Sequence, residues 1–230
     1  MHRMTLRAGM VAALAAGSAA PAQEALMAQP LFDASLARVK PALSPHFHYD
    51  RSERAGCPAP TARCRRPAHL VAGDVVLIGE RRGGFVFATF NDGRGHTTKG
   101  WIESTAVTPL PPATPPPAAW GGHWMADDEA EIDIAVGAGG SVSFRGNAMW
   151  GSHDPQRVRN GGVHVGEIAG SGRPAPDRFG PVAGDDGGDC RIAMRLAPPY
   201  LIVTDNLGCG GMNVSFFGVY RRTGPAESVN

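Results

Sequence analysis

Histidines and clustered carboxylates are the first candidates for chemistry in this sequence. His46 and His48 are one residue apart, so on a β-strand both imidazoles would lie on one face and form half of a metal site. No second pair of ligands lies nearby in the sequence, which favours solvent-facing histidines. The acidic run at 185–189 has the carboxylates that Ca²⁺ prefers but not the spacing of an EF-hand loop, and an exposed turn explains it better. We therefore predict no metal and no cofactor.

Catalytic motifs do not supply an alternative. The sequence has no Gly-x-Ser-x-Gly elbow, no His-Glu-x-x-His and no phosphate-binding loop. It also has no counterpart of the cysteine–histidine module of cell-wall hydrolases. We predict that the protein is not an enzyme.

The four cysteines are expected to form disulfides. Neither Cys57 and Cys64 nor Cys190 and Cys209 have the C-x-x-C spacing of a zinc site. In an exported protein, disulfides are the default state of such residues. Of the three possible pairings, separation along the chain favours Cys57–Cys64 and Cys190–Cys209.

Export is predicted from the first 22 residues. Basic residues Arg3 and Arg7 come first, an apolar run at 8–16 follows, and a tail of small residues ends the segment. This order is typical of a secretory signal peptide, and the apolar run is about half as long as a membrane span. A buried N-terminal helix is the alternative. We predict a periplasmic or secreted protein.

Turn-forming residues dominate the composition. There are 31 glycines and 20 prolines among 230 residues, which argues against a helical bundle, and the net charge of +1 argues against a nucleic-acid binder. Prolines crowd at 109–117, so we expect an extended spacer there. Residues 23–110 carry 11 basic and 8 acidic residues, whereas residues 120–230 carry 9 and 13, so opposite charges permit the two halves to touch.

The predicted organisation has two β domains. The segments are a signal peptide (1–22), an N-terminal extension (23–44), a first domain (45–108), a proline-rich linker (109–119), a second domain (120–223) and a tail (224–230). Short runs rich in β-forming residues, separated by turn residues, predict an all-β fold in both domains. In the first domain we expect strands at 69–72, 75–78, 85–90, 100–102 and near 107.

Three motifs in the first half resemble the bacterial SH3-like (SH3b) domain. They are Gly73-Asp74-x-Val76, Gly84-Phe85-Val86-x-Ala88-x-Phe90 and Gly100-Trp101-Ile102. The resemblance covers about residues 45–110. It implies a small barrel that binds peptides or cell-wall fragments rather than a catalyst.

Candidate ligand-binding residues of this domain are Trp101, Phe85, Arg81 and Arg82. Trp101 would serve as an aromatic platform for a sugar or peptide, or else as an anchor of the core or of a hairpin. Arg81 and Arg82, with Arg65 and Arg66, would form an anion-binding rim, although adjacent arginines on a strand point to opposite faces and solvated surface is the simpler explanation.

The second half is predicted to be an antiparallel sandwich or small barrel. Residues 130–136 and 141–150 form a hairpin, the loop-rich segment 151–189 has one candidate strand at 161–168, and further strands lie at 190–196, 200–204 and 213–222. The tail motif CGGxNVxFxGxYxR, which begins at Cys209, is similar to a tail of exported bacterial proteins, some of which sit beside lysozyme-inhibitor-type domains. Its turn offers the candidate recognition residues Asp205, Asn206, Gly210 and Gly211.

Three functional hypotheses follow. The first is non-catalytic binding of a peptidoglycan fragment or an envelope protein. The second is inhibition of lysozyme or a similar glycosidase through the turn at 205–212. The third is carriage of a small ligand inside the second domain.

Overall fold

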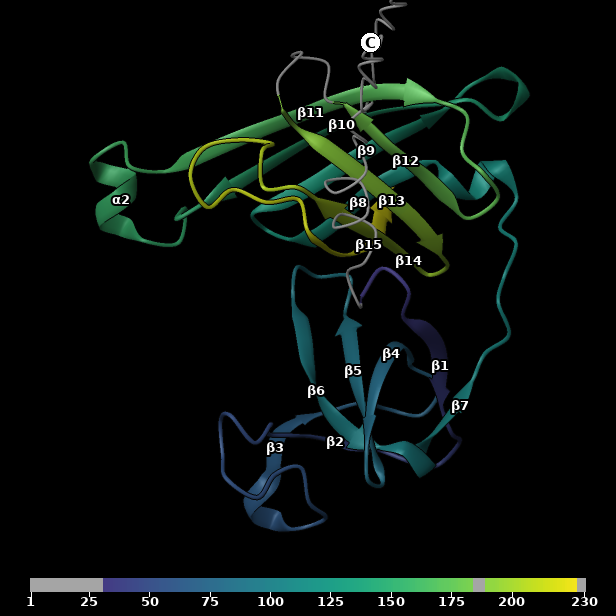
Figure 1. The fold of residues 1–230 in the computed structure, drawn as a ribbon, viewed down its shortest axis with the longest axis vertical. Helices are drawn as coiled ribbons and strands as arrows, with labels where there is room; N and C mark the ends of the chain where they lie inside the picture. Colours follow the sequence, from purple (N-terminus) through teal and green to yellow (C-terminus); the bar gives the residue numbers. More distant parts are fainter. Residues whose placement is uncertain (1–30, 184–188, 227–230) are drawn as a thin grey trace, which may run out of the picture.

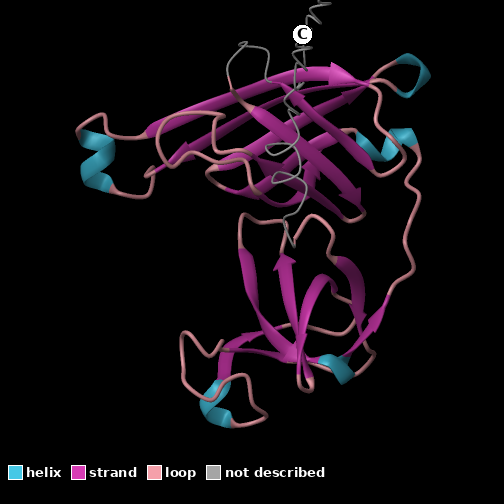
Figure 2. Ribbon diagram, viewed as in Figure 1, coloured by secondary structure: helices cyan, strands magenta, loops and turns pink. Residues whose placement is uncertain are grey.

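The computed structural model describes residues 31–183 and 189–226, and nearly all of their regular structure is β (Figures 1 and 2). The strands form two antiparallel sheets, and the proline-rich segment runs between them. The predicted fold class, two β domains joined by this segment, is confirmed. The expected signal peptide, residues 185–188 of the acidic run and residues 227–230 lie outside the described residues.

The first sheet has seven strands in the order β3-β2-β6-β5-β4-β1-β7. The strands are β1 (Ser35–Val39), β2 (His46–His48), β3 (Arg65–His69), β4 (Val75–Arg82), β5 (Phe85–Asn91), β6 (Thr97–Glu103) and β7 (Val107–Pro109). Alternate residues of β4 and β5, among them Val76, Ile78, Val86 and Ala88, point to one face and form a buried core with Ile102.

Two parts of the first sheet differ from expectation. Residues 35–39, placed in the N-terminal extension, form β1, which pairs with β4 on one side and β7 on the other because Ala37 and Val39 are buried in the core. Residues 70–72, expected to continue a strand from His69, are not in a strand, and the strand that contains His69 is β3, Arg65–His69. The chain turns there, and the Asp74 carboxylate accepts a hydrogen bond from the backbone N–H of Val71 at 2.8 Å.

The second sheet has eight strands in the order β11-β10-β9-β8-β15-β14-β13-β12. The strands are β8 (Gly122–Asp127), β9 (Ala130–Val136), β10 (Val142–Trp150), β11 (His164–Gly172), β12 (Arg178–Ala183), β13 (Arg191–Ala197), β14 (Tyr200–Asp205) and β15 (Gly218–Gly224). Its edge strands β11 and β12 lie in contact, so the sheet curls nearly into a barrel (Figure 1). Large side chains such as Trp124, Phe144 and Tyr220 fill its interior.

The second sheet also departs from the predicted strands at two places. The segment expected to be loop-rich contributes a second strand, β12, in addition to the short helix α2 (Pro155–Arg159). The last strand begins at Gly218 rather than at 213. It starts late because the backbone N–H of Phe216 donates to the Asp205 carboxylate, at 2.5 Å, instead of to a neighbouring strand.

Both predicted disulfides are confirmed. Cys57–Cys64 closes a loop beside the first sheet, and Cys190–Cys209 ties the start of β13 to the loop after β14. Two disulfides indicate an oxidising environment. Within residues 31–183 and 189–226, no helix is long and apolar enough to cross a membrane.

The two sheets are docked against each other rather than merely tethered. A buried cluster, here called the seam, combines side chains from residues 31–36, from β4 of the first sheet and from β13, β14 and β15 of the second. Its members are Phe32, Ala34, Leu36, Leu77, Ala193, Ala197, Tyr200, Ile202 and Val219. The Tyr200 hydroxyl also donates to the carbonyl oxygen of Val75, and Arg195 donates to those of Phe32 and Ala34, so polar contacts accompany the seam. Burial of this apolar surface is the main force that holds the sheets together.

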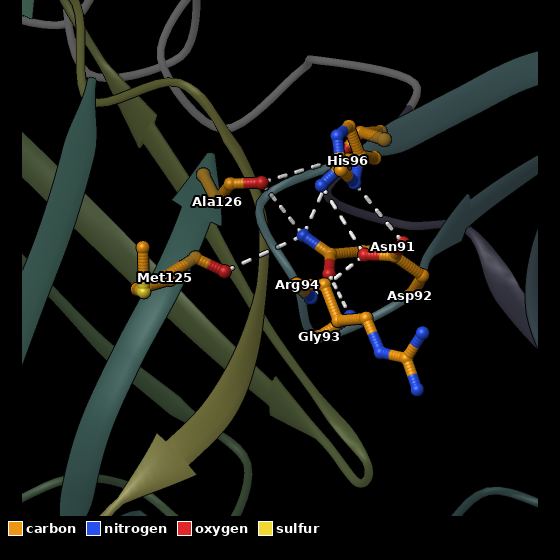
Figure 3. A network of polar contacts seen from close by, with 8 residues as sticks. Asn91, Asp92, Gly93, Arg94, His96, Met125 and Ala126 are labelled. Atoms are coloured by element: carbon orange, nitrogen blue, oxygen red, sulfur yellow. Dashed lines mark hydrogen bonds and ion pairs between the residues drawn. The ribbon is translucent and has the colours of Figure 1, made fainter. Parts of the chain in front are cut away.

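A buried amide at the tip of the β5–β6 hairpin adds a second contact between the sheets (Figure 3). The side-chain nitrogen of Asn91 donates to the carbonyl oxygens of Ala126 at 2.7 Å and Val219 at 2.8 Å. Its side-chain oxygen accepts from the backbone N–H of Gly93 at 2.8 Å, which holds the hairpin turn. Because Asn91 is fully buried, its amide must find its partners within the protein; the carbonyl oxygen of Ala126 also accepts from the Thr97 hydroxyl at 3.3 Å.

We expect Asn91→Ala to lower the free energy of unfolding by about 2–3 kcal/mol, because it removes the buried amide that donates to the carbonyl oxygens of Ala126 and Val219. Chemical denaturation measures this loss. Asn147→Ala is the matched control, since Asn147 is exposed on β10. Equal losses in the two variants would show that the buried amide does not hold the sheets together.

Candidate functional site

A groove with a volume of about 480 Å³ lies where the outer face of the first sheet meets the N-terminal segment and the second sheet. Its lining is Leu31, Ala34, Asp50, Leu77, Gly79, Glu80, Arg82, Phe87, Thr89, Lys99, Trp101 and Phe217. Alternation along β5 explains why Phe87 and Thr89 line the groove, because both point away from the core that Val86 and Ala88 fill. Pockets at the boundary between two units are common ligand sites.

Trp101 forms one wall of the groove through a polar network. Its indole N–H donates to Oδ2 of Asp50 at 2.8 Å, and Nη1 of Arg82 lies 2.9 Å from the same oxygen. The Arg82 guanidinium covers the indole ring at 4.4 Å from its centroid, and Phe87 meets the ring edge-on at 5.4 Å. Only 1% of Trp101 is exposed, so Arg82 occupies the position expected for a stacked ligand.

Asp50 is the acceptor at the centre of this network. Hydrogen bonds from the backbone N–H of Ser52, then from the Trp101 indole, hold the pKa of Asp50 well below its ordinary value, and Arg82 adds to the effect. The ionised form of Asp50 is therefore favoured, and its carboxylate keeps Arg82 over the indole.

Lys99 differs from Arg82 in having no carboxylate partner among the residues that the structure describes. Arg82 contacts two carboxylates, those of Asp50 and Glu80, both at 2.9 Å. The Lys99 ammonium lies 5.9 Å from the ring centroid of Phe217. Phe217 lies in the loop between β14 and β15 of the second sheet and is 38% exposed. The groove thus offers one available cation beside exposed aromatic surface.

The structure brings together two of the four predicted ligand-binding residues, Trp101 and Arg82. Phe85 is buried against the ring of His48, with 4.9 Å between centroids, and does not line the groove. Arg81 is exposed on β4 outside the groove lining. A register shift between Ile78 and Arg81 places Arg82 and Glu80 side by side over the groove.

Four other residues of the groove lining are not predicted from the sequence: Asp50, Phe87, Lys99 and Phe217. Phe87 had a usable signal, because it lies two residues from Phe85 and so on the same face of the strand. Phe217 had none, since it comes from the other half of the chain. Asp50 and Lys99 are recognisable only once β2 and β6 are known to be neighbours.

The predicted recognition turn has mainly structural residues. Asp205 is buried and accepts hydrogen bonds from the backbone of Leu207 and Phe216, and Asn206 accepts one from Arg191. Gly210 lies so close to β11 that a Cβ there would stand 2.7 Å from the Cα of Gly166.

Gly211 also holds the loop after β14 against β11. Gly211 donates its backbone N–H to Val165 at 3.0 Å. The most exposed large apolar side chains of the loop are Leu207 and Met212, with 72% and 75% exposure. The loop is therefore held in place by its hydrogen bonds and presents two apolar side chains, Leu207 and Met212, to solvent.

The candidate metal ligands His46 and His48 are held by backbone carbonyl groups. Nδ1 of His46 donates to Arg66 at 2.9 Å, and Nδ1 of His48 donates to Ala59 at 3.0 Å. His48 is buried, contrary to the solvent-facing position expected, and this burial lowers its pKa. The described part of the chain contains no group of three or more metal-ligating residues.

Comparisons of the chain with protein-family models, with curated proteins and with solved structures find no match.

The position of Asp50 predicts how stability depends on pH. A carboxyl whose pKa is lowered by folding stabilises the fold above its ordinary pKa, and that stabilisation is lost as the pH falls below it. We therefore expect Asp50→Asn to show a smaller drop in thermal unfolding midpoint than wild type between about pH 5 and pH 2.

Glu80→Gln is the matched control for this measurement. Glu80 contacts the same arginine but is exposed, and exposed ion pairs contribute little. We expect the thermal unfolding midpoint of Glu80→Gln to fall with decreasing pH as that of wild type does. An Asp50→Asn profile that also follows wild type would contradict the role given to Asp50.

Proposed function

We propose that the protein is a non-catalytic binding protein of the cell envelope that takes a peptidoglycan fragment in the groove between its two sheets. The observation that carries the proposal is the pairing of an available ammonium, Lys99, with the exposed aromatic surface of Phe217.

The groove suits a ligand with both apolar and anionic parts. Leu31, Ala34 and Leu77 are among the apolar residues that line it, and Phe87 and Phe217 add aromatic rings. A peptide stem of peptidoglycan has short apolar side chains and free carboxylates. Its carboxylate would pair with Lys99 because Arg82 is already neutralised.

Two further observations support a role in the envelope. The motifs at Gly73-Asp74, Phe85–Phe90 and Gly100-Trp101-Ile102 resemble the SH3b domain, which is typically a binder of peptides or cell-wall fragments. The two disulfides indicate an oxidising environment, as the periplasm or cell exterior provides. The signal-peptide pattern at 1–22 accounts for how the chain would reach it.

We expect Lys99→Gln to raise the Kd for a soluble disaccharide–peptide fragment of peptidoglycan about tenfold or more, because it removes the charge that pairs with the ligand carboxylate. Isothermal titration calorimetry measures the change. Lys40→Gln is the matched control, since Lys40 is exposed after β1 and outside the groove.

Two results would contradict the proposed function. One is that wild-type protein does not bind the fragment and is not retained on purified peptidoglycan. The other is an equal loss of affinity in Lys99→Gln and Lys40→Gln, which would separate binding from the groove.

A second candidate function is inhibition of lysozyme or a similar glycosidase through the loop after β14. Its support is the high exposure of Leu207 and Met212 on a loop that the Cys190–Cys209 disulfide and Asp205 hold in place. A rigid loop loses little conformational entropy when it binds a partner.

The double variant Leu207→Ser/Met212→Ser tests this second candidate. Both side chains are mostly exposed, so we expect the fold to be retained and inhibition of lysozyme turnover to be lost. Lysozyme kinetics that do not change with wild-type protein at micromolar concentration would remove the candidate.

The carrier hypothesis receives less support. The interior of the second sheet is filled by packed side chains, including Trp120, Trp124, Phe144, Phe216 and Tyr220. A ligand would have to displace them.

A further inference from the structure

A compact lobe follows β2 at the end of the first sheet farthest from the second sheet (Figure 1). It consists of residues 49–66 and is called the basic lobe below. The lobe contains the short 3-10 helix Ala62–Cys64, and the Cys57–Cys64 disulfide closes it. It lies outside the groove, apart from Asp50.

Charge is concentrated in the basic lobe. It holds five arginines, Arg51, Arg54, Arg63, Arg65 and Arg66, in a chain whose formal net charge is +1. Its two carboxylates, Asp50 and Glu53, are already paired with Arg82 and Arg66.

Three of these arginines are available to a ligand. Arg51, Arg63 and Arg65 are exposed and have no carboxylate partner in the part of the chain that the structure describes. Their charges are not neutralised by an ion pair within the described residues, so the lobe carries an excess of positive charge.

The other two arginines stiffen the lobe. The guanidinium groups of Arg54 and Arg66 lie over the Tyr49 ring, 4.1 and 4.8 Å from its centroid. Arg54 also donates to the carbonyl oxygen of Arg63, and Arg66 pairs with Glu53. The exposed guanidinium groups are therefore carried by a backbone that is fixed before any ligand arrives, which lowers the entropy lost on binding.

We infer that the basic lobe binds an acidic polysaccharide. Arginine forms paired hydrogen bonds with carboxylate, sulfate and phosphate groups, and three exposed arginines on one lobe offer several such contacts to a polymer with repeated anionic groups. This surface is separate from the groove and does not depend on the function proposed for it.

Other anionic partners fit the lobe less well. Single-stranded nucleic acids stack their bases on exposed aromatic rings, whereas the one ring of the lobe, Tyr49, is covered by guanidinium groups. Proteins that lie on membranes insert large apolar side chains, and residues 50–66 contain no apolar residue larger than proline. The oxidising environment indicated by the disulfides also favours an extracellular polymer.

Heparin oligosaccharide is a suitable probe, with the purified full chain as the binding partner. We expect the triple variant Arg51→Gln/Arg63→Gln/Arg65→Gln to raise the Kd for the probe at least about tenfold and to elute from a heparin column at lower salt. The matched control is Arg38→Gln/Arg94→Gln/Arg159→Gln, which removes the same charge from exposed positions outside the lobe. We expect the control to bind nearly as wild type.

Several outcomes would overturn the inference. They are the absence of heparin binding by wild type, an equal loss in both triple variants, or tighter binding of duplex DNA or of phosphatidylglycerol vesicles than of the polysaccharide. The single variants Arg51→Gln and Arg65→Gln give the same comparison should the triple variant not fold. Retained binding of the peptidoglycan fragment by the lobe variant would separate this surface from the groove.

Discussion

The apolar seam between the two sheets is the interaction on which the rest of the structure depends. Leu77 of the first sheet and Tyr200 and Ile202 of the second are buried only because the sheets meet, and Phe32 fills the space between them. Each large apolar side chain contributes roughly 1.5–3 kcal/mol when it is removed from water. The groove exists as a consequence, since Leu31 and Ala34 come from the segment that the seam orders.

Within the groove, the Asp50 carboxylate determines which aromatic ring is open to a ligand. Asp50 accepts from the Trp101 indole and from Arg82, so the ring that the sequence offers as a platform becomes a covered wall. The contact surface open to a ligand moves to Phe217 and Lys99. A polar network of this kind fixes the shape of a site as firmly as packing does.

Local patterns in the sequence predict the parts of the fold that local physics controls. Strand β9 has the expected bounds because Ile132 and Ile134 alternate with polar residues, and both disulfides join cysteines that are close in sequence. The groove could not be predicted in the same way. Its walls include Leu31 and Phe217, which approach only after both sheets have formed and docked. Strand β1 was missed for a related reason, since its buried face is defined by strands that follow it.

The chemistry of the groove is also unusual in the context of the whole sequence. Lys40 and Lys99 are the only lysines, whereas arginine supplies the other cationic side chains. One of the two side-chain amines of the protein therefore lies in the groove, over the ring of Phe217. Reagents that acylate primary amines would modify Lys99 in the groove and Lys40 outside it as the protein's only side-chain amines. Immobilisation through amine coupling at Lys99 would therefore block the groove.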